Sequence, residues 1–272
     1  SLVGSEMCIR DRLDGDPENR GSVPLKEENI ERLDEYMRAF NQPVSRVSLE
    51  QGEYANTGFT QWGASGLAAA WAEENTRESI FNAFRRKETF ATTGTRIAVR
   101  FFGGYNLSSI DLNSESLVSE AYQKGVTMGS DLLHNENKIP EFLVWAQRDK
   151  NGAPLQRIQI IKGWIDNNSG RPKEKVFDVV CSDGMQPDPI TNRCPDNGAR
   201  VNINDCSIST NVGSSELKTV WKDPEFAPDD KTFYYVRVLE NPTCRWSTWD
   251  AIKAGYKPRD CLLYTSPSPR DF

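Results

Sequence analysis

The sequence predicts an α+β protein, in which a part that contains helices is followed by an antiparallel β-sandwich. Up to Arg96 the apolar residues recur mainly at helical spacing, whereas from Ile97 onward they alternate in short segments. Turn signals such as Asn151-Gly152 separate those later segments, which is typical of two-sheet antiparallel folds. We therefore divide the chain into residues 13–96 and residues 97–260; residues 1–12 and 261–272 are set aside for the reason given below.

The N-terminal part begins with a predicted helix over residues 25–40, which ends before Pro43. Its apolar residues near one face are Leu25, Ile30, Leu33, Met37 and Phe40. A compact apolar run follows at residues 67–72. Its alanines leave open whether the run forms a buried strand or one helical turn.

A second helix is predicted to begin at Asn75 or Thr76, because both residue types are good helix caps. We expect three apolar residues of this helix to face inward: Ile80, Phe81 and Phe84. The helix ends in the basic cluster Arg85-Arg86-Lys87, where cations suit the helix dipole.

Short strands are predicted from residue 88 onward, with almost no helical periodicity after Arg96. The first covers residues 88–93 and runs into Gly94. The others cover residues 97–102, 142–145, 158–164, 176–180 and 233–239. The last of these is the clearest strand in the chain, because β-branched and aromatic residues fill it.

Composition excludes some classes of function. The net charge is -6 and no Lys/Arg run occurs, so the chain lacks the basic footprint of a nucleic-acid-binding protein. The apolar runs are far shorter than the roughly 20 residues that a membrane-spanning helix needs. Seven Trp and twelve Phe favour a folded core over disorder.

Both ends of the chain resemble translated sequencing adapter. Cys261-Leu262-Leu263-Tyr264-Thr265-Ser266 fits the codons of a transposon end used to prepare DNA libraries, and residues 2–11 fit the reverse complement of the same adapter. We therefore expect residues 1–12 and 261–272 to be non-native and the protein to be a fragment.

The four remaining cysteines are Cys181, Cys194, Cys206 and Cys244. They lie in polar loops without Cys-x-x-Cys spacing, so two disulfides are favoured over a zinc site, with free thiols as the alternative. If they pair, Cys194 with Cys206 is the easier local bridge, which leaves Cys181 for Cys244. Disulfides would place the protein outside the cytoplasm.

No catalytic constellation is visible by pattern alone. His134, the single histidine, lies in a polar stretch and is more typical of a surface residue than of a metal ligand. Glu73-Glu74 precedes a helix cap and is more typical of a solvated face than of an acid/base pair, which requires convergent geometry.

A series of motifs nevertheless resembles the DUF3604 family, which is similar to the polymerase-and-histidinol-phosphatase (PHP) superfamily of metal-dependent hydrolases. The resemblance covers nearly all of residues 13–260. Its motifs include Trp62-Gly63-Ala64-Ser65-Gly66-Leu67, Glu73-Glu74-Asn75-Thr76-Arg77-Glu78, Phe90-Ala91-Thr92-Thr93-Gly94-Thr95-Arg96, Ile160-Ile161-Lys162-Gly163-Trp164 and Tyr234-Tyr235-Val236-Arg237-Val238-Leu239-Glu240.

This resemblance implies that the intact parent is a phosphoesterase-like hydrolase that uses a divalent metal. The family's His-x-His and Asp-Thr-His ligand motifs do not occur here, so we expect no metal site in this chain and no activity from it alone. The fold implied is the C-terminal end of a metal-dependent α/β barrel domain over residues 13–96, followed by the β-sandwich.

Candidate substrate-binding residues follow from the barrel expectation, because the C-terminal ends of barrel strands face the active site. Thr92, Thr93 and Gly94 would then lie near the metal, and Arg85, Arg86 or Arg96 could bind an anionic group of a small-molecule substrate. The alternative is that these arginines pair with Glu78 or Glu88 at the domain junction. The stretch containing Trp62 and Ser65 is either a substrate loop or a simple connection.

A second hypothesis makes the β-sandwich a module that binds carbohydrate or a partner protein. Aromatic side chains on its surface could stack on sugar rings, with core packing as the alternative role. The candidates are Trp164, Trp221, Trp246 and Trp249.

Overall fold

The computed structural model describes residues 67–135, 138–167 and 169–244, together with Thr248 and Ile252. For four short strands it describes the backbone alone: β1 (Val23–Pro24), β2 (Arg46–Leu49), β3 (Gly52–Ala55) and β14 (Tyr264–Thr265). The helix predicted over residues 25–40 lies outside the described residues, as do Trp62, Ser65, Trp246 and Trp249.

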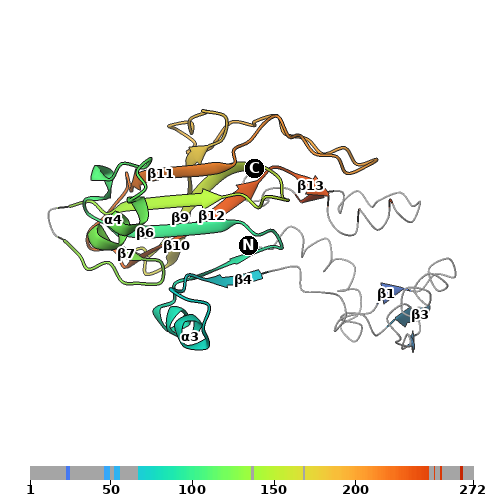
Figure 1. The fold of residues 1–272 in the computed structure, drawn as a ribbon, viewed down its shortest axis with the longest axis horizontal. Helices are drawn as coiled ribbons and strands as arrows, with labels where there is room; N and C mark the ends of the chain where they lie inside the picture. Colours follow the sequence, from blue (N-terminus) through green and yellow to red (C-terminus); the bar gives the residue numbers. More distant parts are fainter. Residues whose placement is uncertain are drawn as a thin grey trace.

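Two antiparallel sheets form the main body of the described chain (Figure 1). One has the order β11-β8-β6-β7 and the other the order β10-β9-β12. The first contains β6 (Ala98–Gly104), β7 (Gly125–Thr127), β8 (Glu141–Gln147) and β11 (Glu216–Lys222). The second contains β9 (Leu155–Ile165), β10 (Pro172–Cys181) and β12 (Thr232–Glu240). The predicted sheet-rich α+β class is thus confirmed.

The two sheets share an apolar core that contains residues of both. Val144 and Ala146 of β8 pack in one cluster with Ile158 of β9, and all three are fully buried. Alternate residues of β6 and β12, such as Val99 and Val238, pack against the same cluster. Side chains on strands point alternately to opposite faces, so these residues mark the inner faces of the sheets.

A second apolar cluster covers the other face of the four-stranded sheet. There Phe102 and Leu143 pack against the 3-10 helix η2 (Leu107–Ser109) and the helix α4 (Leu117–Lys124) (Figure 1). Strand β8 is therefore buried on both faces, which explains its continuous apolar run. The expectation of almost no helix after Arg96 was wrong at α4, and β7 and β11 were not predicted.

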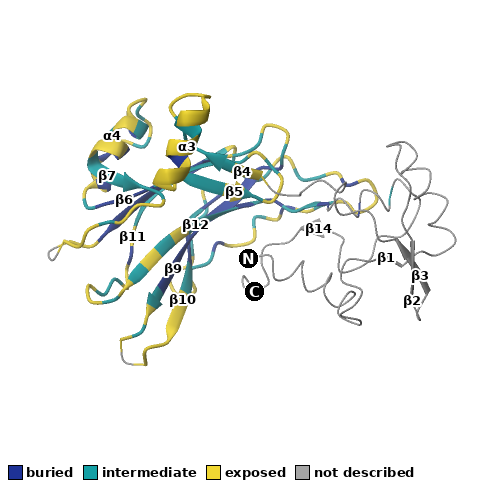
Figure 2. Cartoon of the chain, turned by 90° about the horizontal axis from the view of Figure 1, so that it is seen from below, coloured by how far each residue is buried: buried dark blue, intermediate teal, exposed yellow. Residues whose placement is uncertain are grey.

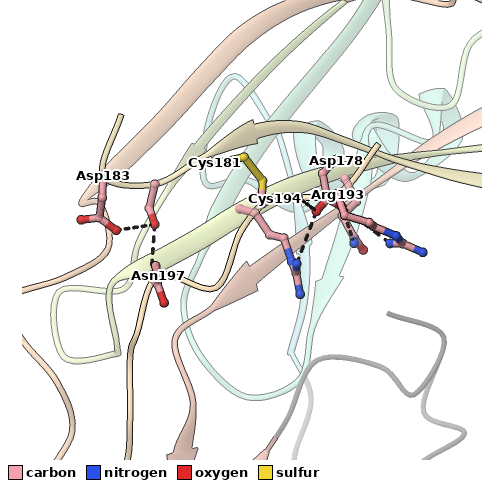
Figure 3. The surroundings of a disulfide bond; sticks show 9 residues. Asp178, Cys181, Asp183, Arg193, Cys194 and Asn197 are labelled. Carbon is pink, nitrogen blue, oxygen red and sulfur yellow. Dashed lines mark hydrogen bonds and ion pairs between the residues drawn. A yellow bond between two sulfur atoms is a disulfide. The ribbon is translucent and has the colours of Figure 1, made fainter. Parts of the chain in front are cut away.

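Two disulfides hold the long loop that follows β10. They join Cys181 to Cys194 and Cys206 to Cys244, each with 5.6 Å between the Cα atoms. The prediction of two disulfides is confirmed, but the expected pairing of Cys194 with Cys206 and Cys181 with Cys244 was wrong. The turn after β10 brings Cys194 back to the strand, where its backbone N–H donates to Asp178 (Figure 3).

A smaller unit precedes the two sheets. It consists of β4 (Leu67–Ala70), α3 (Arg77–Arg86) and β5 (Thr89–Thr92), with β4 and β5 paired antiparallel (Figure 1). The run at residues 67–72 is thus a strand over most of its length. The expectation that Phe81 and Phe84 face inward was wrong, because both are more than half exposed and Ala83 is the buried residue of α3.

Candidate functional site at the junction of the two units

Helix α3 begins as the sequence predicts. Thr76 is its N-cap, and the Thr76 hydroxyl accepts a hydrogen bond from the backbone N–H of Ser79 at 3.2 Å. The acidic pair Glu73-Glu74 before the helix is exposed, and the Ser79 hydroxyl donates to Glu73 at 3.0 Å. These contacts agree with the solvated role predicted for the pair. The N-cap therefore fixes where α3 begins, and Lys87, in the left-handed conformation, ends it after Arg86.

The arginines at the end of α3 contact residues of their own unit. Arg86 Nη2 lies 3.1 Å from Glu73 Oε1 and 3.5 Å from Glu88 Oε2. The guanidinium of Arg85 lies over the ring of Phe81, 6.0 Å from its centroid. The contact between Arg86 and Glu88 is the ion pair that the alternative interpretation predicted.

Glu88 also joins this unit to the two sheets. Its side chain is almost fully buried, and it accepts a hydrogen bond from the hydroxyl of Tyr122 on α4. Burial, followed by the hydrogen bond to Glu88, raises the pKa of Tyr122. Arg100 of β6 lies 3.7 Å from the ring centroid of Trp71 and donates to the Tyr122 hydroxyl at 3.2 Å. Buried charge and cation–π contacts therefore hold the junction together.

The turn after β5 leads directly to the two-sheet body. Gly94 has a φ of 132°, a conformation that favours glycine, and its N–H donates to the Thr92 hydroxyl at 3.3 Å. The backbone N–H of Arg96 donates to Asp149 Oδ2 at 2.8 Å. Asp149 lies in the loop between β8 and β9, so this hydrogen bond connects the predicted turn to the sheets.

Asp149 and Glu240 form a pair of carboxylates with opposite pKa shifts. Burial at the end of β12, with a smaller effect of the Asp149 charge, raises the pKa of Glu240 to about 7. The Thr95 hydroxyl donates to Glu240 and opposes this shift. The backbone N–H groups of Arg96 and Asn151 lower the pKa of Asp149. Such pairs are suited to general acid–base chemistry, since one member stays ionised and the other exchanges its proton near neutral pH.

Glu240 Oε1 is buried and has no hydrogen-bond partner in the structure. A Cβ placed on Gly152 would lie 3.2 Å from this oxygen. Because glycine has no Cβ, Glu240 Oε1 can lie close to the main chain of the β8–β9 loop. A buried carboxylate oxygen without a donor is costly and commonly marks a functional position.

The structure brings some predicted site residues together and separates others. Thr92, Gly94 and Arg96 lie in one turn beside the carboxylate pair. Arg85 and Arg86 lie at the end of α3, where Arg86 is bound to Glu73 and Glu88. Thr93 is exposed within the turn.

Asp149 and Glu240 were not predicted as site residues. Each is an ordinary surface-type residue in sequence, and only the fold brings the two segments together. The Asp149-Lys150-Asn151-Gly152 turn sequence was a detectable signal, but it indicated a turn and not a carboxylate pair.

Among the described residues, no three potential ligands of the types His, Cys, Asp or Glu form a metal-binding group. His134 lies in an exposed loop, as predicted. Within the same ranges, no helix is long and apolar enough to cross a membrane.

The described residues define a sheet-rich α+β protein with two disulfides and a carboxylate pair where its two units meet. A profile of the family described as protein of unknown function (DUF3604) matches residues 27–267. Because the match covers most of the 272 residues, the chain belongs to the DUF3604 family. No curated protein and no solved structure matches the chain.

Proposed function

We propose that this chain is the C-terminal part of a metal-dependent hydrolase that cleaves phosphoester or related bonds. The proposal rests on the resemblance of its motifs to the PHP superfamily of metal-dependent hydrolases. The described residues do not supply a metal-ligand set, so the ligands would come from elsewhere in the intact protein. The disulfides support a periplasmic or secreted location for it.

The observation that carries the proposal furthest is the half-buried carboxylate of Glu240 beside the turn after β5. With a pKa of about 7, Glu240 could accept or donate a proton at the pH where such enzymes work. Thr95 would hold its carboxylate by a hydrogen bond. Thr92, Thr93 and Gly94 would line the approach for substrate, and Arg96 would bind an anionic substrate group.

The test uses the protein extended upstream to include His-x-His and Asp-x-His motifs, assayed with p-nitrophenyl phosphate and bis-p-nitrophenyl phosphate. We expect hydrolysis of at least one ester, its loss in a chelator and its return with a divalent metal. The Glu240→Gln variant should lose most of the activity, whereas the Glu115→Gln variant at an exposed position should keep it. Hydrolysis that survives metal removal, or no hydrolysis of either ester, would overturn the proposal.

A second candidate function is glycan binding by the two-sheet body. The predicted Trp221 does not support it, because its ring packs against Phe177 at 5.1 Å and against Phe142 at 6.0 Å. Trp164 is half-buried, with Lys162 Nζ 5.3 Å from its ring centroid. A different pair of aromatic residues, Phe233 and Tyr235, favours this function, because both side chains are exposed.

A further inference from the structure

Helix α3 carries two exposed phenylalanines on one side, and much of its surface is exposed (Figure 2). Phe81 is 58% exposed and Phe84 is 53% exposed, and residues three apart in a helix are neighbours on its surface. Within the described ranges, the one ring interaction of either residue is that of Arg85 with Phe81. The described chain thus leaves an apolar patch on α3.

The strand pair beside α3 also lacks apolar burial. Within the described part of the chain, β4 pairs with β5 alone, and Leu67 at the start of β4 is 43% exposed. A two-stranded sheet is marginally stable by itself and requires further packing. Glu88 joins this unit to α4, but that contact is polar. An apolar partner on α3 would therefore supply burial that the unit needs.

The charges around the patch favour an acidic partner. Arg77 and Arg85 each lie four residues from Phe81, so they share its side of the helix. Both arginines are exposed, and neither forms an ion pair with a described residue. The acidic residue of α3 is Glu78, in the first turn, where a negative charge interacts favourably with the helix dipole. Two arginines against one glutamate leave this side of α3 positive.

Residues 25–40 of the same chain have the matching character. The sequence predicts an amphipathic helix there, whose apolar face includes Ile30. The segment contains five acidic and three basic residues, so its net charge is -2. In a helix, Glu27 and Asp34 are three and four residues from Ile30, which places carboxylates beside the apolar face. The segment therefore complements α3 in both apolar surface and charge.

The covalent connection favours this segment over a second copy of the chain. Residues 41–66 join it to β4, and a connection of this length gives an effective concentration on the order of millimolar. A second chain at micromolar concentration competes poorly with it. The DUF3604 profile begins at residue 27, so it includes nearly all of the segment together with α3.

We propose that residues 25–40 form a helix that packs its apolar face on Phe81 and Phe84 of α3. Its acidic residues lie toward Arg77 and Arg85 and set its orientation. Because α3 leads into β5, this packing also stabilises the strand before the turn beside the carboxylate pair. The proposal does not depend on hydrolysis, because it concerns packing within the chain alone.

Hydrogen exchange of the full chain, followed by mass spectrometry, tests this packing. We expect residues 25–40 to be protected, and Phe81→Ser together with Phe84→Ser to speed their exchange at least about tenfold. Phe233→Ser is the matched control, because Phe233 is 60% exposed but lies on β12. It should leave the exchange of the segment unchanged. Unchanged exchange in β9 shows that the two-sheet body of each variant is folded.

Substitutions in the segment provide the reciprocal test. Ile30→Ser together with Leu33→Ser should speed exchange in α3 by a similar factor. Glu35→Gln is the control, because this position lies on the opposite face of the predicted helix. Charge reversal by Arg77→Glu and Arg85→Glu should speed exchange of the segment by a smaller factor, about threefold.

Three results would overturn the proposal: no protection of residues 25–40, protection that survives replacement of both phenylalanines, or protection that increases with protein concentration. The last result would indicate a second copy of the chain as the partner. An extended protein that hydrolyses neither phosphoester would refute the proposed hydrolase and leave these exchange results unaffected.

Discussion

Lys162 Nζ lies 2.6 Å from Asp223 Oδ2 between the two sheets, and neither side chain is more than 3% exposed. Lys162 also donates to the backbone carbonyl of Glu225 at 2.6 Å, and the Tyr234 hydroxyl donates to Asp223 at 2.7 Å. Burial, followed by the hydrogen bond to Asp223, raises the pKa of Tyr234 far above its ordinary value of 10.0. Lys162 of β9 and Tyr234 of β12 are thus both joined to Asp223, in the segment that follows β11.

Removing one member of the pair should destabilise the protein strongly. Lys162→Met leaves an uncompensated carboxylate in the interior, so we expect a loss of about 3–5 kcal/mol in the free energy of unfolding. Denaturant titration monitored by tryptophan fluorescence measures it. Lys218→Met breaks the more exposed pair with Glu216 and should cost at most about 1 kcal/mol. Equal losses for both variants would contradict the structural role of the buried pair.

Glu240→Gln should change how stability depends on pH. The pKa of Glu240 is 4.5 ordinarily and about 7 in the fold, so the folded state holds the proton more tightly. The protonated Glu240 carboxyl therefore adds to the free energy of unfolding. This contribution is fully present below pH 4.5 and is lost as the pH rises through 7. In the unaltered chain this loss of stability is on the order of 1–2 kcal/mol after allowing for partial solvent screening. The Gln variant should not show it when thermal unfolding is measured from pH 4 to 8.

The control for that measurement is Glu115→Gln, because Glu115 is exposed. Its unfolding curve should follow that of the unaltered chain at every pH. A Glu240→Gln variant that shows the same pH dependence as the unaltered chain would place the proton uptake at another residue.

The two disulfides should differ in how much they stabilise the fold. Cys206 and Cys244 are 38 residues apart in sequence, whereas Cys181 and Cys194 are 13 residues apart. Loop-closure entropy then predicts that replacing the longer-range pair by serine costs about 1 kcal/mol more. Unfolding of the two double-serine variants measures the difference, and peptide mapping without reduction checks the connectivity. Recovery of a peptide that joins Cys194 to Cys206 would refute the pairing.

Tyr122→Phe should loosen the unit that contains α3 and β5. Without its hydroxyl, buried Glu88 loses a hydrogen-bond donor, which costs about 1–3 kcal/mol. Hydrogen exchange should become faster in residues 71–92 and stay unchanged in β9. Tyr105→Phe is the control, since the Tyr105 hydroxyl donates to the carbonyl of Leu133 in an exposed loop. Faster exchange throughout both sheets would show that the contact supports the whole fold instead.

Much of the local structure could be predicted because the signals are local. Thr76 caps α3 as expected, and each strand expected between residues 88 and 239 is present. Strand β11 was missed because its apolar residues do not alternate regularly with polar ones: Val220 and Trp221 are adjacent in Glu216–Lys222. Helix α4 has eight residues, which is too short for its periodicity to stand out.

Errors arose where the outcome depends on residues distant in sequence. Periodicity indicates an apolar face on α3, but it does not tell whether another element covers Phe81 and Phe84. The disulfide prediction favoured the local bridge between Cys194 and Cys206, whereas strand β10 and its returning turn decide the true partner of Cys194. The pairing of Asp149 with Glu240 likewise depends on where the β8–β9 loop and the end of β12 meet, which no local pattern contains.

Strand β8 lies between both apolar clusters, with Leu143 in one and Val144 in the other. Local opening of either cluster must therefore disturb a strand that the other cluster also needs. The two sheets and α4 should consequently unfold as one cooperative unit, with the amides of β8 exchanging only through global unfolding. A substitution at Val144 would then also lower the stability of α4, on the opposite side of the sheet.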